Sequence, residues 1–239
     1  LKSRNIPCPD SRWFLKPSSY AYLLSSMKRI PTIHKLTLLT IFVQLLPANS
    51  PNILVIFTDD QGYGDLACYG NPNTKTPRLD QLAKEGTRFT SFYTQTVCGP
   101  SRSALLTGRY PCRSKGWGMP ASEITFGELM REKGYQTACI GKWDVSNRKA
   151  IIDRMPNAQG FDYYFGALGA NDGGGVKFHE NNKAAGSSRD MGELITLYTD
   201  KSIEFLKEKR DPKKPFVLYL AHTMMHTIID ASDRFRGKS

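Results

Sequence analysis

Runs of consecutive apolar residues constrain the fold of this chain more than any other feature. Asn52-Ile-Leu-Val-Ile-Phe57 and Phe216-Val-Leu-Tyr-Leu-Ala221 are two such runs, and Tyr135-Gln-Thr-Ala-Cys-Ile140 is expected to be a further strand. Strands without polar alternation are typical of parallel sheets, in which both faces are covered. The sequence therefore predicts a mostly parallel central sheet.

Helical signals separate these strands. Helices are expected from Pro77 after the capping Thr76, from the capping box Thr125-Phe-Gly-Glu128, and over residues 194–209. In the first of these helices Leu79, Leu82 and Ala83 share one face. Because strands alternate with helices, the predicted fold class is α/β, with helices on both faces of the sheet.

The secondary structure of two further stretches is predicted from weaker periodicity. Arg88-Phe-Thr-Ser-Phe-Tyr93 alternates like a strand and leads toward Cys98. Between residues 145 and 193, Gly160-Phe-Asp-Tyr-Tyr-Phe-Gly166 fits either a short strand or a packing loop, and the glycine-rich run at 171–175 is expected to be flexible.

The net charge of +11 does not indicate a nucleic-acid partner. Residues 1–50 hold seven Lys/Arg and one Asp, so they account for six of these charges. No basic run interleaved with aromatic residues marks a nucleic-acid face. The five cysteines include no zinc-type Cys-x-x-Cys pair, and pairing of Cys68 with Cys112 in an oxidising compartment stays open.

The N-terminal region is predicted to lie outside the folded domain and to include a cleaved signal peptide. Met27–Lys35 is positively charged, Leu36–Leu46 is apolar, and Pro47–Ser50 offers small residues for cleavage, which together indicate a secretory signal peptide at 27–50. The apolar part is too short for a stable membrane span. We therefore expect a secreted or periplasmic protein whose domain occupies 51–239, with 1–26 as an unstructured upstream segment.

Reactive side chains follow each predicted strand. Asp59 and Asp60 come after the first strand, Lys142 after the second, and His222 and His226 after the last. If the strands are parallel, all of these residues lie at one edge of the sheet, where open α/β sheets bind ligands. Adjacent buried carboxylates need a cation, and oxygen ligands favour calcium or magnesium.

A short helix is predicted between the first two strands. In Cys98-Gly-Pro-Ser-Arg-Ser-Ala-Leu-Leu-Thr-Gly-Arg109, Pro100 suits the first helical position and Gly108 closes the helix. Cys98 then lies just before a helix N-terminus, which attracts anions. Arg102 follows one turn later and can reach the same place. A soft thiolate suits a hard ion poorly, so an oxygen nucleophile at position 98 would fit better.

This run resembles the sulfatase signature, Cys-x-Pro-Ser-Arg followed by Leu-x-Thr-Gly-Arg. Segments 51–70, 141–143 and 221–226 are also similar to sulfatase motifs, and the resemblance covers only the front half of the family's catalytic domain. It implies an alkaline-phosphatase-like fold and hydrolysis of sulfate esters. The substrate would be a sulfated small molecule or sulfated glycan.

The resemblance also implies roles for individual residues. Cys98 would be oxidised to formylglycine by a maturation enzyme and, with Asp59 and Asp60, would hold Ca²⁺, with Mg²⁺ as the other possibility. Arg102 and Lys142 would be catalytic. His226 would be catalytic and would contact the sulfate together with Lys142. His222 would join the substrate-binding set, although by itself it fits a packing histidine equally well.

Three departures from the family pattern keep alternatives open. Asp144 stands where the family has His, and Ile228 stands where it has Pro. The family's later Asp-Asn pair, which completes the metal site, does not occur after residue 226. The ion would then lack two oxygen ligands, and an unpaired sheet edge would favour aggregation. The alternatives are an inactive truncated sulfatase and a related hydrolase of phosphate or phosphonate esters.

Overall fold

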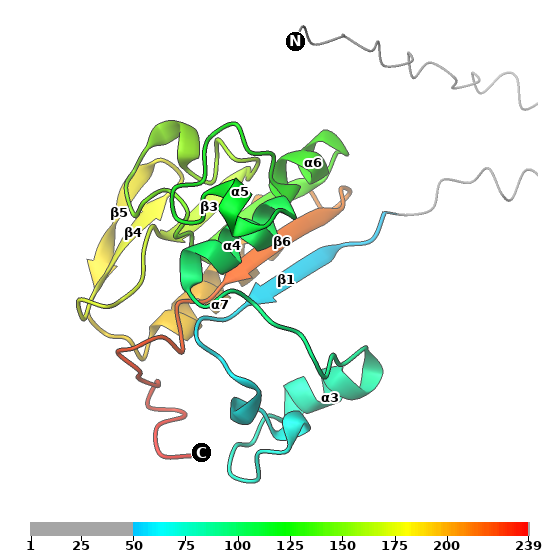
Figure 1. Ribbon diagram of the computed structural model, residues 1–239, viewed down its shortest axis with the longest axis vertical. Coiled ribbons are helices and arrows are strands. Elements are labelled where there is room, and N and C mark those ends of the chain that lie inside the picture. The colour runs from blue at the N-terminus through cyan, green and yellow to red at the C-terminus, as the bar shows by residue number, and fades with distance from the viewer. Residues whose placement is uncertain (1–49, 239) are drawn as a thin grey trace, which may run out of the picture. The chain divides into compact units, whose positions relative to one another are not determined.

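A six-stranded sheet forms the centre of the computed structural model, which describes residues 50–238 (Figure 1). The strands are β1 (Ile53–Phe57), β2 (Gln136–Lys142), β3 (Tyr163–Ala167), β4 (Val176–Glu180), β5 (Lys183–Ser188) and β6 (Phe216–Ala221). Their order across the sheet is β1-β6-β2-β3-β4-β5. The first four strands in this order are parallel, whereas β4 and β5 are antiparallel additions. The predicted parallel sheet is confirmed as the main part of a mixed sheet.

The register of β1, β6 and β2 aligns their carboxyl ends. Ala221, at the end of β6, is level with Phe57 of β1 and with Gly141 of β2. Residues that follow these positions in the chain therefore emerge at one edge of the sheet. This alignment places the expected reactive residues of three strands next to one another.

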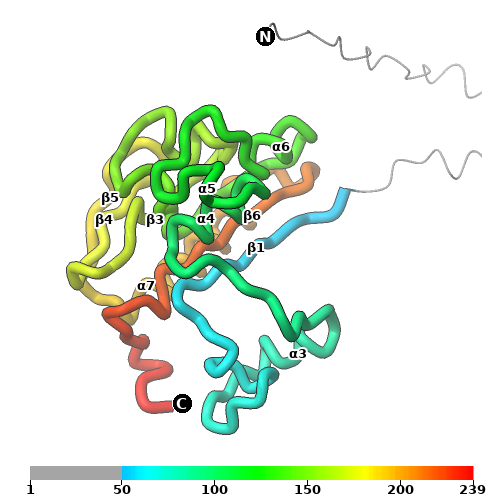
Figure 2. Tube along the Cα trace, viewed as in Figure 1, coloured from blue at the N-terminus to red at the C-terminus, as the bar shows by residue number. Residues whose placement is uncertain are grey.

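Helices cover both faces of the sheet, as predicted (Figures 1 and 2). The helices and short helical turns are η2 (Tyr63–Asp65), η3 (Ala67–Tyr69), α3 (Pro77–Glu85), α4 (Cys98–Thr107), α5 (Pro111–Ser114), α6 (Phe126–Glu132), η4 (Ile152–Arg154), α7 (Leu194–Glu204) and the π-helical turn η5 (Phe205–Lys209). On one face, Leu106 of α4 packs with Trp143 and Tyr219. On the other face, Leu194 and Tyr198 of α7 pack with strand residues. The alternate residues of β2 and β6 thus enter two separate cores.

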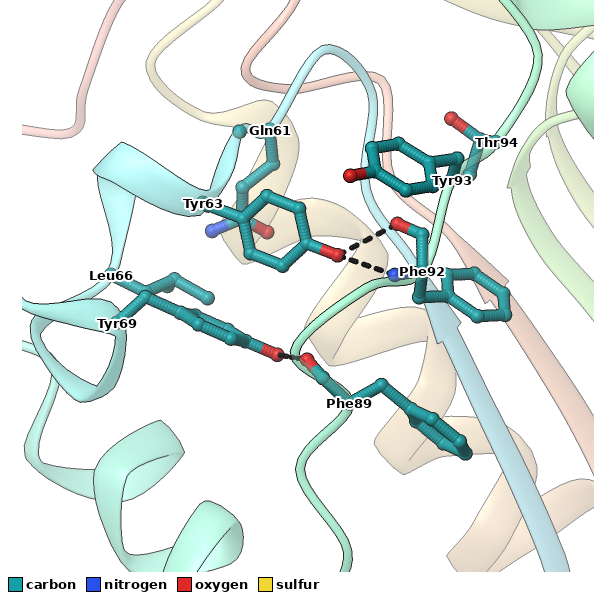
Figure 3. Close-up of a pocket in the computed structure, with 9 residues that line it drawn as sticks. Gln61, Tyr63, Leu66, Tyr69, Phe89, Phe92, Tyr93 and Thr94 are labelled. Carbon is teal, nitrogen blue, oxygen red and sulfur yellow. Dashed lines mark hydrogen bonds between the residues drawn. The ribbon is translucent and has the colours of Figure 1, made fainter.

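The prediction of a strand at 88–93 is wrong. Two tyrosines from the preceding turns bind its backbone instead (Figure 3). The Tyr63 hydroxyl donates to the carbonyl of Phe92 at 2.8 Å and accepts from its N–H at 2.7 Å, and the Tyr69 hydroxyl donates to the carbonyl of Phe89 at 2.8 Å. Because these side chains use backbone groups that a ladder would need, the segment stays extended without joining the sheet.

The aromatic residues of this segment line an open pocket of about 440 Å³ that begins directly after Asp60 (Figure 3). Its walls include Tyr63, Tyr69 and Phe89, and they supply no cationic side chain. The pocket therefore lacks the charge that a sulfate or phosphate group requires.

The helix expected after Thr76 forms as α3, but its apolar face is not buried in the sheet. Leu82 of this helix is 62% exposed and Leu79 is 43% exposed. The other segment that the sequence did not reveal is the hairpin β4–β5, in which Asn181 adopts a left-handed φ of 52° at the turn. Neither strand carries the apolar run that identified β1 and β6.

Strand β1 lies at an edge of the sheet, and one of its faces is open. Leu54 and Ile56 share this face and are 54% and 53% exposed. An exposed apolar edge strand is a template for association with another chain.

We expect the double substitution Leu54→Lys and Ile56→Lys to lower the aggregated fraction of the purified chain, because charged side chains on an edge strand oppose edge-to-edge pairing. Light scattering after size-exclusion chromatography measures this fraction. Ile152→Lys is the control, since Ile152 is 62% exposed in the turn η4. Equal aggregation of the double variant and the parent chain would contradict the expectation.

Candidate functional site

A buried ion pair joins the ends of two strands that are not neighbours in the sheet. The Nζ of Lys142, at the end of β2, lies 2.5 Å from Oδ2 of Asp59, which follows β1. The loop after β6 lies between them and is bound to the same residue, because the N–H of Asp59 donates to the carbonyl of Met224 and the N–H of Met225 donates to the carbonyl of Asp59. Three loops are therefore fixed around one carboxylate.

Gly141 permits this arrangement immediately before Lys142. Its φ of 109° lies in the left-handed region, and a Cβ at this position would collide with the carbonyl group of Ala221. A side chain here would push β2 and β6 apart and displace the lysine. Glycine is therefore required on steric grounds at the point where the strand delivers Lys142.

Arg102 supplies the second cation to Asp59. It extends from α4 and is fully buried, and its Nη2 lies 3.4 Å from Oδ1 of Asp59. Its guanidinium also donates to the carbonyl of Lys142 at 3.0 Å and to the carbonyl of His222 at 3.3 Å. The sequence predicted that Arg102 reaches the site, and it does so as a counter-ion and backbone clamp.

The two cations determine the charge of Asp59. Burial by itself would raise the pKa of this carboxyl, but the neighbouring Arg102 and Lys142 outweigh it and hold the pKa below its usual value. Asp59 is consequently an anion at neutral pH, and both of its oxygens face positive charge.

Cys98 is the first residue of α4, with Val97 as the N-cap, so the helix begins earlier than predicted and Pro100 is its third residue. The thiol is half-buried beside Asp59 and Lys142. Burial raises its pKa, Lys142 opposes that rise, and Asp59 adds to it, with a net increase. The unmodified side chain is thus a neutral thiol near pH 7, despite its place at a helix N-terminus.

The two adjacent aspartates do not face the same way. Asp59 is buried, whereas the side chain of Asp60 is 59% exposed and its backbone adopts a φ of 58°. Asp60 approaches the site only through His226, whose Nε2 lies 3.8 Å from its Oδ2. The donor atoms that do gather are a carboxylate oxygen of Asp59, Sγ of Cys98 and a ring nitrogen of His226, all within 4.8 Å of one another.

This donor set does not fit a calcium ion as it stands. Calcium takes six to eight oxygen ligands, and the gathered group offers one carboxylate, a sulfur and a nitrogen. Replacement of the sulfur at position 98 by oxygen would remove part of the mismatch. The fit to a hard ion thus depends on the chemical state of residue 98.

The two histidines lie in different surroundings. His226 directs Nδ1 to the carbonyl of Thr227 at 2.5 Å and Nε2 toward Asp172, whose Oδ1 is 3.4 Å away. His222 is turned inward against Tyr198, and burial, assisted by Arg102, lowers its pKa to about 4. His222 is therefore a neutral packing side chain near pH 7, and His226 is the histidine that faces the site.

A second charge network, which sequence reasoning missed, adjoins the first. Asp144 is fully buried and accepts from the indole N–H of Trp117 at 3.1 Å and from Nε of Arg148 at 3.0 Å, while Lys142 lies 3.6 Å away. Arg148 also contacts Asp172 at 2.8 Å. The negative charge of Asp144 is thus matched locally by Arg148, so it adds no unpaired anion beside the site.

Sequence signals for this network were weak. Asp172 lies in the glycine-rich run that was expected to be flexible, and Arg148 is one of several basic residues in a segment without period. The only indication was chemical, because an aspartate at position 144 beside an anion site requires a cation. Both oxygens of Asp144 are engaged by Trp117 and Arg148, so this carboxylate is not free to act as a metal ligand.

The other cysteines within residues 50–238 take no part in the site. Cys68 and Cys112 are free thiols, so the disulfide left open by the sequence is not formed in the structure, and Cys139 is buried in the core. Within residues 50–238, no helix combines the length and apolar character needed to cross a membrane. The predicted signal peptide, apart from Ser50, lies outside the described residues.

These features define an α/β protein with a polar centre at the carboxyl edge of a mainly parallel sheet, and comparison with known proteins identifies its family. The family model named Sulfatase matches residues 51–239. The chain therefore belongs to the sulfatase family, which confirms the resemblance seen in the signature around Cys98.

Individual relatives agree with this assignment. The chain is 33% identical to the N-acetylgalactosamine-6-sulfatase of Canis lupus familiaris over 223 residues, with 79% of this chain and 42% of the relative covered. It is 44% identical to human arylsulfatase A over 150 residues, with 57% and 29% covered. The chain thus spans less than half the length of these relatives.

A solved structure shows the same fold. A protein whose structure was solved in complex with its substrate, D-glucosamine-2-N,6-O-disulfate, superposes on this chain with a TM-score of 0.63 at 32% identity, and the match covers 74% of this chain and 35% of that one. The alkaline-phosphatase-like architecture expected from the resemblance is therefore confirmed for the part of the fold that the chain contains.

We expect Arg102→Met to reduce the free energy of unfolding by about 3–5 kcal/mol, because it removes one of the two buried cations that face Asp59 and takes the guanidinium donor away from the carbonyl groups of Lys142 and His222. Urea titration followed by circular dichroism measures the loss. Arg236→Met is the control, since Arg236 contacts Asp230 at 3.1 Å from an exposed position and its loss should cost less than about 1 kcal/mol. Similar costs for the two variants would contradict this view of Arg102.

The depressed pKa of His222 predicts acid sensitivity. Between pH 6.5 and 4 the unfolded chain binds a proton at this residue that the folded chain excludes, so the free energy of unfolding falls as the pH is lowered through this window. The contribution is up to about 3 kcal/mol. Urea titrations at several pH values should show that the free energy of unfolding depends less on pH in His222→Phe than in the parent chain; an unchanged dependence would refute the prediction. The stability that comes from the lowered pKa of Asp59 is lost only at lower pH, below the ordinary aspartate pKa of 3.8.

Proposed function

We propose that this chain provides the nucleophile and the anion-binding half of a sulfatase active centre, and that the protein hydrolyses sulfate esters. The observation that carries the proposal is the gathering of Cys98, Lys142 and His226 around Asp59 at one sheet edge. Membership of the sulfatase family gives this cluster its reaction class. No comparable set of cations lines the aromatic pocket beyond Asp60.

The nucleophile of the proposal is an oxygen formed from Cys98. As an unmodified residue, Cys98 has a raised pKa, which makes it a weak nucleophile at neutral pH. Oxidation to formylglycine by a maturation enzyme would place hydroxyl groups of the hydrated aldehyde at the same position. Asp59, held as an anion, accepts a hydrogen bond there and can orient such a hydroxyl.

The cationic residues would receive the sulfate group. Lys142 points its ammonium at the space between Asp59 and Cys98, and it can stabilise negative charge that develops on a sulfate oxygen. Nε2 of His226 lies near Asp60 and Asp172, and when both ring nitrogens carry protons it can donate one to the leaving oxygen. Arg102 is buried behind Asp59, so its role is to keep that carboxylate ionised and positioned.

A divalent ion belongs to the proposal only for the modified chain. With oxygen at position 98, Asp59 and Asp60 would be its carboxylate ligands, and Ca²⁺ or Mg²⁺ would be the ion that such donors favour. Bound there, the ion would draw negative charge from the sulfate oxygens. Asp60 must rotate inward for this, because its side chain now faces solvent.

The substrate class is a sulfated sugar or a sulfated small molecule. Names of relatives support it, since one is an N-acetylgalactosamine-6-sulfatase and one solved neighbour holds a disulfated glucosamine. Secretion through the predicted signal peptide at 27–50 would bring the protein to extracellular or periplasmic glycans.

The proposal predicts turnover of 4-nitrophenyl sulfate by the chain co-expressed with a formylglycine-generating enzyme. Cys98→Ala should reduce the rate to the buffer background, whereas Cys112→Ala, which removes an exposed thiol, should retain it. Mass spectrometry of the peptide that contains residue 98 establishes the conversion to an aldehyde. A fully converted chain without turnover would support an inactive sulfatase fragment, and turnover of phosphate but not sulfate esters by an unconverted chain would favour the related phosphohydrolases.

A further inference from the structure

Before modification, the cluster at the sheet edge has the ligand types of a different kind of metal site. Cys98 offers a sulfur, His226 a ring nitrogen and Asp59 a carboxylate oxygen, with all three ligand atoms within 4.8 Å of one another. Ligands around a tetrahedral zinc ion lie about 3.3–3.8 Å apart. Side-chain movements that shift the ligand atoms by about an ångström therefore suffice to bring all three within bonding distance of such an ion.

The hydrogen bonds of two ligands leave the necessary atoms available. His226 uses Nδ1 for the carbonyl of Thr227, so the proton resides on Nδ1 and the lone pair on Nε2. A backbone carbonyl that orients the imidazole in this way is the usual support for a metal-bound histidine. In Asp59, Lys142 contacts Oδ2 at 2.5 Å, while Arg102 contacts Oδ1 at the longer distance of 3.4 Å.

The charges around the cluster also favour a divalent ion bound to a thiolate. The two connected networks contain four carboxylates and three cationic side chains, namely Asp59, Asp60, Asp144 and Asp172 with Arg102, Lys142 and Arg148. Ionisation of Cys98 adds a fifth negative charge, and a divalent ion brings the positive charges to five. The ion and the thiolate together thus bring this network to formal neutrality.

We propose that the unmodified chain binds Zn²⁺ through Asp59, Cys98 and His226, with water completing a tetrahedral set. The thiolate and imidazole select a borderline ion such as zinc over calcium. Binding displaces the thiol proton to solvent and forms a sulfur–metal bond, with no change in oxidation state. Conversion of Cys98 to an aldehyde removes the sulfur and abolishes the site, so zinc binding and maturation exclude each other.

The inference concerns the residues of the proposed active centre, yet it does not depend on sulfate hydrolysis. It requires only a free thiol at position 98, whereas the hydrolase proposal requires the modified residue. The zinc experiments can therefore fail while sulfatase turnover of the modified protein stands, and the reverse also holds.

The test uses the full chain expressed without a maturation enzyme and stripped of metal. Co²⁺ serves as the spectroscopic probe, because a thiolate ligand gives an intense near-ultraviolet charge-transfer band. We expect this band in the parent chain, its loss in Cys98→Ser, and its disappearance when Zn²⁺ displaces Co²⁺. Iodoacetamide labelling of Cys98, measured by peptide mass spectrometry, should slow about 100-fold at roughly 100 times the Kd of Zn²⁺.

Internal and matched controls keep the test decisive. Labelling of the exposed Cys112 should not respond to Zn²⁺, and Ca²⁺ should not protect Cys98. His226→Ala should weaken zinc binding at least tenfold, about the smallest effect expected of a lost ligand, whereas His179→Ala on β4 should not. A charge-transfer band that persists in Cys98→Ser, equal protection by Ca²⁺, or unprotected Cys98 in a chain with native circular dichroism would overturn the proposal.

Discussion

The contact between Lys142 and Asp59 is the interaction on which the rest of the site depends. Both side chains are buried, so each would be costly without the other. The pair connects the ends of β1 and β2 across β6, and the backbone of Asp59 is bonded to the loop that carries His226. Loss of either charge would therefore affect the positions of all three loops. Arg102 extends the same constraint to α4 and to Cys98.

The sequence predicted the elements whose pattern follows from burial alone. The apolar run of β6 is buried within the sheet as expected, whereas the run of β1 forms an edge strand with one open face. The capping box at Thr125 forms as expected, with its side chain accepting from the N–H of Glu128. Convergence of Asp59 and Lys142 followed from parallel pairing. What could not be predicted was how each charge is neutralised, because that depends on neighbours distant in the sequence.

Two errors have the same physical origin. The alternation at 88–93 is compatible with a strand, but Tyr63 and Tyr69 bind the backbone of Phe92 and Phe89, a contact that no local pattern reveals. The network of Asp144 was missed for the same reason, since its partner Arg148 gains its role only through the fold. The orientation of Asp60 away from Asp59 likewise arises from a backbone conformation that sequence reasoning did not anticipate.

A double-mutant cycle on Asp59 and Lys142 tests the central claim most directly. The free energy of unfolding is measured for the parent, Asp59→Asn, Lys142→Met and the double variant. We predict that each single substitution is strongly destabilising and that the two costs are far from additive, with a coupling energy of about 3 kcal/mol or more. Additive costs, with a coupling energy near zero, would show that the two side chains do not meet and would contradict the account.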